Sequence, residues 1–547
     1  MANDKSTTNP YVIGVAAFST IGGLLFGYDQ GVVSGLLEME NFIYHFPRIY
    51  FDSNYKGWFV STFLLCAWLG SLINSPIADK IGRKHSIIVA CIIFCIGCVF
   101  QTVAINDPMI FAGRGVSGVA VGMLTMVVPM YISETAPPQI RGALVVMQQL
   151  SITFGILISY WIDYGCNYIG GTRCAPDIPY SGGAADKPEF DPYNDVGPDG
   201  CTGQSTASWR IPTALQMAFA LVLLVGMFFL PYSPRWLLSK DRDADALNTL
   251  AKLRRLPIDD PVLQDELAMI KAEVLFERSN VPEHLKGCSA VELFFRHYWY
   301  ILTTWPHFKR VFIGSAVMFF QQFLGCNAII YYAPTIFGQL GMDGNTTSLL
   351  ATGIYGVVNF VSTFIPIFLI DRVGRRILLM AGSVGVVCSL VVMAAVVGRY
   401  GDELGQHKSA GYAGMVFVYI YCVNFAYSYA PIGWVLPSEI FSLSIRSKAI
   451  SVTTSATWMC NFIIGLVSPM MLEKITWGTY VFFAAFGVIA FFFTYFFIPE
   501  TKGRSLEEMD KVFGDTAASE DKDKLATVAH EVGQDIAKSQ NVHVENA

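Results

Sequence analysis

Long apolar runs, each bounded by charged residues or turn formers, alternate with short polar segments along most of this chain. A helix needs about 20 mostly apolar residues to cross a bilayer. Twelve runs meet this length, namely 11–36, 55–78, 86–105, 109–132, 141–163, 210–230, 310–337, 348–370, 377–398, 411–441, 446–471 and 478–498. The pattern therefore predicts an all-α membrane protein with twelve transmembrane helices.

The twelve runs form two groups of six, separated by a charged segment. Within that segment, 241–256 and 262–278 have the composition of short amphipathic helices. We expect two six-helix halves joined by a helical cytoplasmic linker. The predicted divisions are an N-terminus at 1–10, a first half at 11–232, a linker at 233–309, a second half at 310–498 and a tail at 499–547.

Composition supports the membrane interpretation and excludes one class of partner. Of 547 residues, 15% are charged and 53% are hydrophobic, whereas soluble domains carry about 25% charged residues. The net charge of −6 provides no basic surface for nucleic acid. Lys and Arg concentrate in alternate loops, and such loops stay cytoplasmic. The sequence thus predicts a multi-pass protein of the plasma membrane, in contact with the lipid bilayer, with both termini in the cytoplasm.

The long loop at about 164–209, predicted to be external, contains three cysteines, Cys166, Cys174 and Cys201. An oxidising environment permits one disulfide among them, and the sequence leaves open which two cysteines pair. A second external loop contains the sequon Asn345-Thr346-Thr347, so Asn345 is a candidate glycosylation site.

The two halves repeat the same charged turns. DKIGRK at 79–84 follows the second span, and DRVGRR at 371–376 follows the eighth. A Glu and an Arg seven residues apart flank the turns after spans four and ten, and proline-led segments at 231–236 and 499–504 close each half. Such repetition is typical of transporters built from related halves.

These turns place opposite charges at the cytoplasmic ends of neighbouring helices, where they can pair in one conformation and separate in another. We interpret them as a gate. The alternative is that they only anchor the topology, since a surface ion pair contributes about 0 to 1 kcal/mol. The candidate gate residues are Asp79, Arg83, Glu134, Arg141, Asp371, Arg375, Glu439 and Arg446.

Uncharged amides within the spans indicate a polar ligand, because intramembrane polar groups usually face the bundle interior. Gln321, Gln322 and Asn327 lie within little more than one turn, and Gly325 between them can loosen the helix. Amides donate and accept hydrogen bonds, as a sugar hydroxyl does, and aromatic rings can cover the apolar face of a sugar. Each amide alone could instead join two helices. Further candidates are Gln149, Asn359, Trp434, Thr457 and Asn461.

Asp29 is the only carboxylate well inside a predicted span, and an unpaired charge there costs about 2.5 to 3.5 kcal/mol. Arg114 on the fourth span is a cation at membrane depth. We hypothesise that the two residues form an ion pair that breaks when Asp29 takes up a proton.

Together the motifs resemble the sugar porter family of the major facilitator superfamily. They are GGLLFGYDQGVVSG (22–35), DKIGRK (79–84), GRGVSGVAVG (113–122), PMYISETAPPQIRG (129–142), PYSPRWLL (231–238), QQFLGCNAIIYYAP (321–334), DRVGRR (371–376), WVLPSEIF (434–441) and PETKGRSLEEMD (499–510). One departure is Tyr232, where the family commonly has Glu.

This resemblance implies the major facilitator fold and a role in sugar transport. Family sugar sites match Gln149, Gln321, Gln322, Asn327, Asn359, Trp434 and Asn461, with Phe26 and Tyr331 nearby. Proton-coupled members use the acid and the base that match Asp29 and Arg114. Some facilitators keep the acid as well, so its presence leaves symport and uniport both open.

Other chemistries lack the residues they need. The chain has no GxxxxGK[ST] phosphate loop and no HExxH motif, and all eight His lie outside the predicted spans. We expect no metal, no cofactor and no enzymatic activity. The predicted function is transport of a monosaccharide, glucose or a related hexose or xylose, with proton symport. A facilitative uniporter, a polyol or quinate transporter and a non-transporting sugar receptor are the alternatives.

Overall fold

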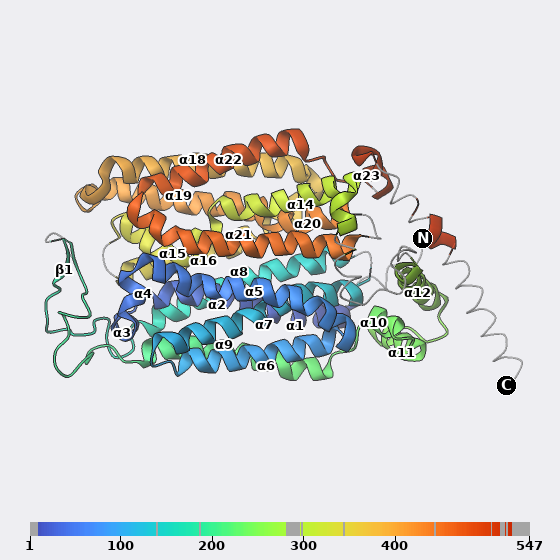
Figure 1. Ribbon diagram of the computed structural model, residues 1–547, viewed down its shortest axis with the longest axis horizontal. Coiled ribbons are helices and arrows are strands. Elements are labelled where there is room, and N and C mark those ends of the chain that lie inside the picture. Colours follow the sequence, from blue (N-terminus) through green and yellow to red (C-terminus); the bar gives the residue numbers. More distant parts are fainter. Residues whose placement is uncertain are drawn as a thin grey trace, which may run out of the picture.

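The computed structural model describes residues 9–137, 140–184, 187–279, 296, 299–342, 345–441, 445–504, 506–514, 520 and 523–527. Its long helices run side by side along one axis, as Figure 1 shows, with the N-terminal half in blue to green and the C-terminal half in yellow to red. One end of the bundle carries α3 (Glu40–His45), α4 (Pro47–Phe51) and a β-hairpin, and we call it the hairpin end. The other carries the linker helices and Asn9, whose side chain donates to the Leu253 carbonyl of the linker, and we call it the terminal end.

Twelve helical units match the twelve predicted spans. Ten units of the described chain are long and apolar enough to cross a membrane, a bent helix pair is an eleventh, and α8 has 26 residues. The N-terminal half contains α1 (Pro10–Ser19), α2 (Ile21–Leu36), α5 (Ser53–Ile81), α6 (Arg83–Thr102), α7 (Asp107–Thr135), α8 (Arg141–Cys166) and α9 (Ala207–Phe229). The C-terminal half contains α14 (Trp305–Phe323), α15 (Cys326–Gln339), α16 (Asn345–Ser362), α17 (Ile365–Val373), α18 (Arg375–Tyr400), η2 (Gly401–Gly405), α19 (Lys408–Tyr427), α20 (Tyr429–Ile440), α21 (Arg446–Lys474) and α22 (Trp477–Phe497).

Short elements cover the two ends. The hairpin end holds α3 (Glu40–His45), α4 (Pro47–Phe51), and the antiparallel strands β1 (Gly182–Ala184) and β2 (Lys187–Glu189). The terminal end holds α10 (Pro234–Ser239), α11 (Asp243–Arg254), α12 (Pro261–Ser279) and α23 (Leu506–Phe513). The helices α11 and α12 correspond to the two amphipathic segments expected in the linker.

Glycines allow α2 and α8 to approach closely. Gly27, Gly31 and Gly35 are four residues apart and therefore share one face of α2. A Cβ at Gly27 would lie 1.9 Å from the carbonyl oxygen of Ile152, and one at Gly31 would lie 1.8 Å from the hydroxyl of Ser159. A larger residue at these positions would push the two helices apart, so the glycine spacing fixes how α8 sits against α2.

Three glycines with positive φ mark the turns that shape the site. Gly82 (φ 91°) separates α5 from α6, and Gly374 (φ 101°) separates α17 from α18, so both repeated charged turns have the same form. Gly325 (φ 92°) interrupts the seventh span between α14 and α15. L-residues with side chains rarely adopt this backbone conformation, which explains why glycine occupies each turn.

The two halves meet in the region between mid-height and the hairpin end. On the hairpin side, Tyr160 donates to the carbonyl of Ile330 at 2.7 Å, and a Cβ at Gly57 would lie 2.3 Å from the carbonyl oxygen of Leu466. At mid-height, Trp68 Nε1 donates to the Ser455 hydroxyl at 2.6 Å. The structure therefore has a bundle whose halves are closed together at the hairpin end.

Candidate functional site

A buried ion pair lies in the core of the N-terminal half. Arg114 Nη1 on α7 lies 2.9 Å from Oδ2 and 3.2 Å from Oδ1 of Asp29 on α2, and both side chains are at most 2% exposed. Arg114 also donates to the carbonyls of Phe59 and Val60, each at 3.3 Å, and lies 4.7 Å from the ring centroid of Phe63. These contacts replace the water molecules that the guanidinium loses when it is buried, and they therefore lower the cost of burying its charge.

The residue after Asp29 connects this ion pair to the other half. Gln30 Nε2 donates to the hydroxyl of Tyr331 on α15 at 3.0 Å, and that hydroxyl donates to Oδ1 of Asn461 on α21 at 3.3 Å. The sequence predicted Tyr331 and Asn461 as site residues but not Gln30. An amide adjacent to an intramembrane acid was the available signal for it.

The amides around the Gly325 turn form a second chain of hydrogen bonds. Asn327 Nδ2 donates to Gln322 Oε1 at 2.6 Å, and Gln322 Nε2 lies 3.4 Å from Gln321 Oε1. Gln321 Nε2 in turn donates to the carbonyls of Tyr429 and Ala430 where α20 begins, at 2.9 and 3.2 Å. The turn at Gly325 thus brings three buried amides close together, and hydrogen bonds from Gln321 connect them to the start of α20.

The remaining predicted substrate residues have other neighbours. Phe26 packs edge-on against Trp458 with ring centroids 5.1 Å apart, and Thr457 donates to the carbonyl of Thr453 at 3.2 Å. The indole Nε1 of Trp458 is buried and has no hydrogen-bond partner among the described residues, so Trp458 is a polar aromatic that the sequence did not single out. Three more candidates lie on other helices, namely Gln149 on α8, Asn359 on α16 and Trp434 on α20. Among the described residues, no side-chain hydrogen bond joins them to either chain of amides.

The repeated charged turns form matching networks at the terminal end. In the N-terminal half, Arg83 lies 3.0 Å from Asp79 and 3.0 Å from Glu134. In the C-terminal half, Arg375 lies 2.9 Å from Asp371 and 2.8 Å from Glu439. Each Arg begins one helix and reaches the Glu near the end of another, so each network joins helices of the same half.

A hydroxyl from the closing segment completes each network. Ser233 donates to Glu134, and Thr501 donates to Glu439 at 2.5 Å. Arg446 donates to the carbonyl of Phe441 at 3.4 Å. The side chain of its predicted counterpart, Arg141, lies outside the described residues.

Tyr232 changes one of the two networks. In the C-terminal half, Glu500 accepts hydrogen bonds from the backbone N–H groups of Arg375 at 3.0 Å and Arg376 at 3.1 Å. Tyr232 occupies the corresponding position in the N-terminal half, where its ring lies 4.8 Å from Lys84 Nζ. A cation–π contact therefore takes the place of a charged helix cap.

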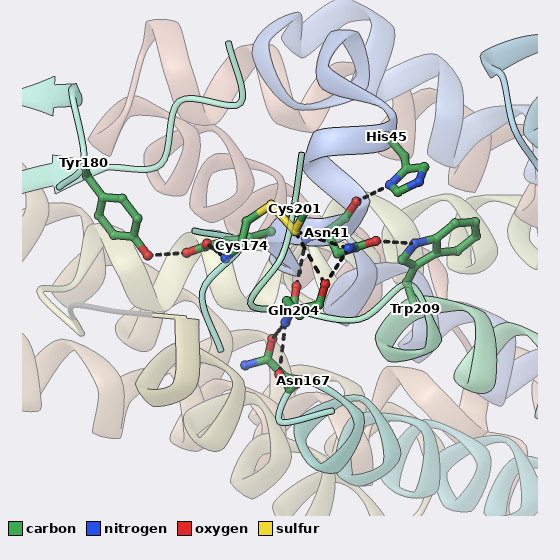
Figure 2. The surroundings of a disulfide bond; sticks show 9 residues. Asn41, His45, Asn167, Cys174, Tyr180, Cys201, Gln204 and Trp209 are labelled. Atoms are coloured by element: carbon green, nitrogen blue, oxygen red, sulfur yellow. Dashed lines mark hydrogen bonds between the residues drawn. A yellow bond between two sulfur atoms is a disulfide. The ribbon is translucent and has the colours of Figure 1, made fainter. Parts of the chain in front are cut away.

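The loop between α8 and α9 contains a disulfide between Cys174 and Cys201, which are 27 residues apart, and Cys166 is a free thiol. Figure 2 shows the disulfide beside Asn41 of α3. The backbone N–H of Asn41 donates to Gln204 Oε1 at 2.8 Å, and the Trp209 indole N–H donates to Asn41 Oδ1 at 3.1 Å. The disulfide thus belongs to a network that holds the loop against α3. The sequon residue Asn345 begins α16, and its side chain lies outside the described residues.

Asp163 is a further buried carboxylate that the sequence did not single out. Its side chain is fully buried on α8. Sequence reasoning missed it because residue 163 was the last position of the predicted span, where a charge is ordinary. Among the described residues, no cluster of three His, Cys, Asp or Glu could hold a metal ion.

Comparison with known proteins places this arrangement in a family. A family model described as "Sugar (and other) transporter" matches residues 15–513. The chain belongs to this family of sugar transporters. Because the matched region includes both halves, the amide chains, ion pair and charged turns lie within a transporter of the major facilitator superfamily.

Curated relatives agree with the family. The transporter is 34% identical over 535 residues to a low-affinity glucose transporter of Saccharomyces cerevisiae, covering 94% of this chain and 85% of that protein. Hexose transporter 2 of Kluyveromyces lactis is 33% identical over 506 residues, covering 90% and 81%. An Aspergillus clavatus protein named "Probable quinate permease" is 32% identical over 532 residues, covering 93% and 89%.

Solved structures agree with the fold. The xylose transporter XylE of E. coli in a partially occluded, inward-open conformation has a TM-score of 0.69 and 26% identity, covering 91% of this chain and all of that one. The XylE proton:xylose symporter bound to 6-bromo-6-deoxy-D-glucose also has a TM-score of 0.69, with 27% identity and 92% and 99% coverage. The transporter is therefore a multi-pass membrane protein with the twelve-helix fold.

Proposed function

We propose that this transporter carries a neutral hexose together with a proton across the plasma membrane by alternating access. The hairpin end faces outward and both termini lie in the cytoplasm. The proposal rests on one observation, which is that the buried ion pair lies next to a residue that bonds to the predicted sugar site. Asp29 pairs with Arg114, and the adjacent Gln30 bonds to Tyr331 in the opposite half.

The sugar site uses the groups that now bond to one another. Gln322, Asn327 and Asn461 exchange their mutual hydrogen bonds for bonds to sugar hydroxyls, because amides can donate and accept at once. Phe26 and the unpartnered indole N–H of Trp458 supply an apolar face and a further donor. Gln149, Asn359, Trp434 and Thr457 complete the site from the surrounding helices.

Protonation of Asp29 couples the movement of the proton to that of the sugar. Ionised Asp29 holds Arg114, and uptake of a proton by the carboxylate removes the charge that attracts the guanidinium. Motion of α2 or α7 then reaches the sugar site through Gln30, which contacts Tyr331 directly. The proton thus biases the equilibrium between two arrangements of the halves.

The charged networks at the terminal end act as the cytoplasmic gate. Arg83 and Arg375 each bind two acids within one half, so neither network ties the halves together in this conformation. With the halves closed at the hairpin end, this is an inward-facing arrangement. Release of Glu134 and Glu439 lets these ends rearrange when the transporter opens outward.

A hexose is the favoured substrate for two reasons. The relatives from Saccharomyces and Kluyveromyces are named as glucose and hexose transporters. The groups assembled on α14 and α15 are neutral amides, which suit hydroxyls better than the carboxylate of quinate. Xylose, with one hydroxymethyl group fewer than glucose, is the natural competitor.

The test measures radiolabelled glucose uptake and external pH together in cells that lack their own hexose carriers. We expect uptake with alkalinisation of the medium in the wild type. Asp29→Asn should keep sugar exchange and lose the pH change, whereas Asp177→Asn, on the exposed loop, should keep both. Uptake without a pH change in the wild type would establish a uniporter, binding without flux would establish a receptor, and stronger uptake of quinate would overturn the hexose assignment.

A further inference from the structure

Asp163 on α8 is a buried carboxyl that the transport mechanism above does not use. Its side chain is 0% exposed, and neither carboxyl oxygen has a hydrogen-bond partner among the described residues. The ion pairs of the described chain do not include it either, in contrast to Asp29, which has Arg114 at 2.9 Å. An isolated buried carboxylate is one of the costliest groups a protein can contain.

The surroundings of Asp163 leave it no counter-charge. The carboxyl occupies the notch opposite Gly35 of α2, where a Cβ would lie 2.4 Å from Oδ2. The titratable groups close enough to act on it electrostatically are Tyr28 on α2 and Tyr160 and Cys166 on α8. All three are neutral when protonated, so none can balance a negative charge.

We propose that Asp163 is a second proton-binding site, separate from Asp29 and filled from the hairpin end. The carboxylate takes one proton at Oδ1 or Oδ2 and becomes a neutral acid, and no other bond forms or breaks. The tight packing of α2 on α8 fits the neutral acid, because an ionised group would need water or a cation in a space that Gly35 barely leaves open. A proton needs only one carboxyl oxygen, whereas a sodium ion needs several oxygen ligands, and no N–H or hydroxyl of the described residues bonds to either oxygen of Asp163.

The position of Asp163 connects this proton to the external loop. Asn167 lies one turn further along, and its backbone N–H donates to the Asp163 carbonyl at 2.9 Å. Gln204 Nε2 donates to Asn167 Oδ1 at 3.0 Å, and Figure 2 shows Gln204 between Asn167 and Asn41 of α3. Loss of the proton would loosen the end of α8 from α2 and, through Asn167, the loop from α3. Asp163 therefore makes closure of the hairpin end depend on external pH.

This inference concerns regulation by pH and does not require that a proton accompanies the sugar. Two measurements on the full-length protein in lipid nanodiscs and proteoliposomes test it. The first is the infrared band of a protonated carboxyl near neutral pH. We expect the band in the wild type and in Asp29→Asn, and its loss in Asp163→Asn. Asp163→Ser is the second variant, with the same expectation, if the Asn variant does not insert.

The second measurement is sugar exchange at equal sugar concentrations as a function of external pH. We expect exchange by the wild type to fall at alkaline pH and exchange by Asp163→Asn to remain at its acidic-pH rate throughout. A band that survives in both Asp163 variants, or a band that depends on sodium, would show that Asp163 holds no proton. An unchanged alkaline fall in Asp163→Asn would show that the proton does not control the hairpin end. Failure of the symport proposal alone would leave both Asp163 results in place.

Discussion

Gln30 and Tyr331 join the two halves of the transporter by a 3.0 Å hydrogen bond next to a buried ion pair. Gln30 follows Asp29 on α2, and Tyr331 also bonds to Asn461 on α21. A single hydroxyl therefore links the proposed proton site, the proposed sugar site and the contact between the halves. Removing that hydroxyl should affect all three.

Tyr331→Phe should weaken sugar binding by about tenfold, because two hydrogen bonds to a buried hydroxyl are lost and Gln30 and Asn461 keep unmatched polar atoms. The measurement is the KM for glucose uptake. Tyr332→Phe is the matched control, since its hydroxyl donates to the Gly465 carbonyl at 2.8 Å, away from the amides. Equal effects of the two variants would indicate that Tyr331 serves only packing.

Replacing one partner of the buried ion pair should destabilise the protein more than replacing both. Arg114→Leu leaves Asp29 buried and unpaired, which costs about 3 to 5 kcal/mol for a buried pair, whereas the double variant Asp29→Asn, Arg114→Leu removes both charges. Thermal unfolding in detergent of the two single variants and the double variant gives the coupling energy. Additive losses would mean that the two charges do not interact in the folded protein.

The sequence alone predicted most of the fold, because the bilayer requires long apolar helices, and charged residues and turn formers mark where each helix ends. Gly325 was predicted to loosen the seventh span, and the structure has a turn at this residue. Partners across the two halves could not be predicted, since no local pattern links Gln30 to Tyr331. Three cysteines in one loop allowed three pairings, and only the packing of the loop on α3 determines that Cys174 and Cys201 join.

Asp163 and Trp458 could not be predicted from the sequence, for different reasons. Asp163 ends a predicted span, and only the three-dimensional packing against Gly35 shows that it is buried. Trp458 follows the predicted Thr457, but an aromatic residue in an apolar span is as suited to helix packing as to covering a sugar. The roles of the amides remain predictions, whereas their grouping around Gly325 is a property of the structure.

Cys174→Ser should lower the stability of the transporter by about 2 to 4 kcal/mol, because the disulfide closes a loop of 27 residues that packs on α3. The change is measured by thermal unfolding under oxidising conditions, with Cys166→Ser as the control, since Cys166 is a free thiol. An equal loss of stability in Cys166→Ser would show that the disulfide between Cys174 and Cys201 is not the source of the effect.

Docking of the loop between α8 and α9 onto α3 should weaken as pH rises. Burial raises the pKa of Glu40 on α3, although the Tyr180 hydroxyl and the Cys174 N–H donate to its carboxyl and act in the opposite direction. A raised folded-state pKa contributes stability that is complete below the unfolded pKa and is lost as pH rises through the folded value. Hydrogen exchange of residues 174–180 should therefore quicken with pH beyond its intrinsic rise.

Glu40→Gln is the matched variant for this effect, because an amide retains an acceptor oxygen and cannot ionise. Its loop should lose the part of the excess pH dependence that Glu40 causes and keep only the part that Asp163 transmits through Asn167. Asp195→Asn is a poor substitute as a control, since hydrogen bonds and Arg173 outweigh burial and hold the pKa of Asp195 below its ordinary value. The same excess pH dependence in Glu40→Gln would assign it to another group.

Tyr232→Glu should stabilise the N-terminal half. At the matching position, Glu500 accepts from the first two backbone N–H groups of α18, whereas α6 begins after Gly82 without a side-chain cap. A carboxylate at 232 can accept from the corresponding N–H groups of α6 and pair with Lys84, which now contacts the Tyr232 ring. A helix cap of this kind contributes about 0.5 to 2 kcal/mol.

The gain is measured by thermal unfolding, with Tyr232→Gln and Tyr232→Ala beside Tyr232→Glu. Gln can accept a hydrogen bond without a charge and should give a smaller gain, and Ala should destabilise because it loses the ring that stacks on Trp236. If Glu destabilises as much as Ala, the contacts of the ring with Lys84 and Trp236 outweigh a cap at this helix. In that case the two halves would differ in how their charged turns are held, because one uses a carboxylate and the other a ring.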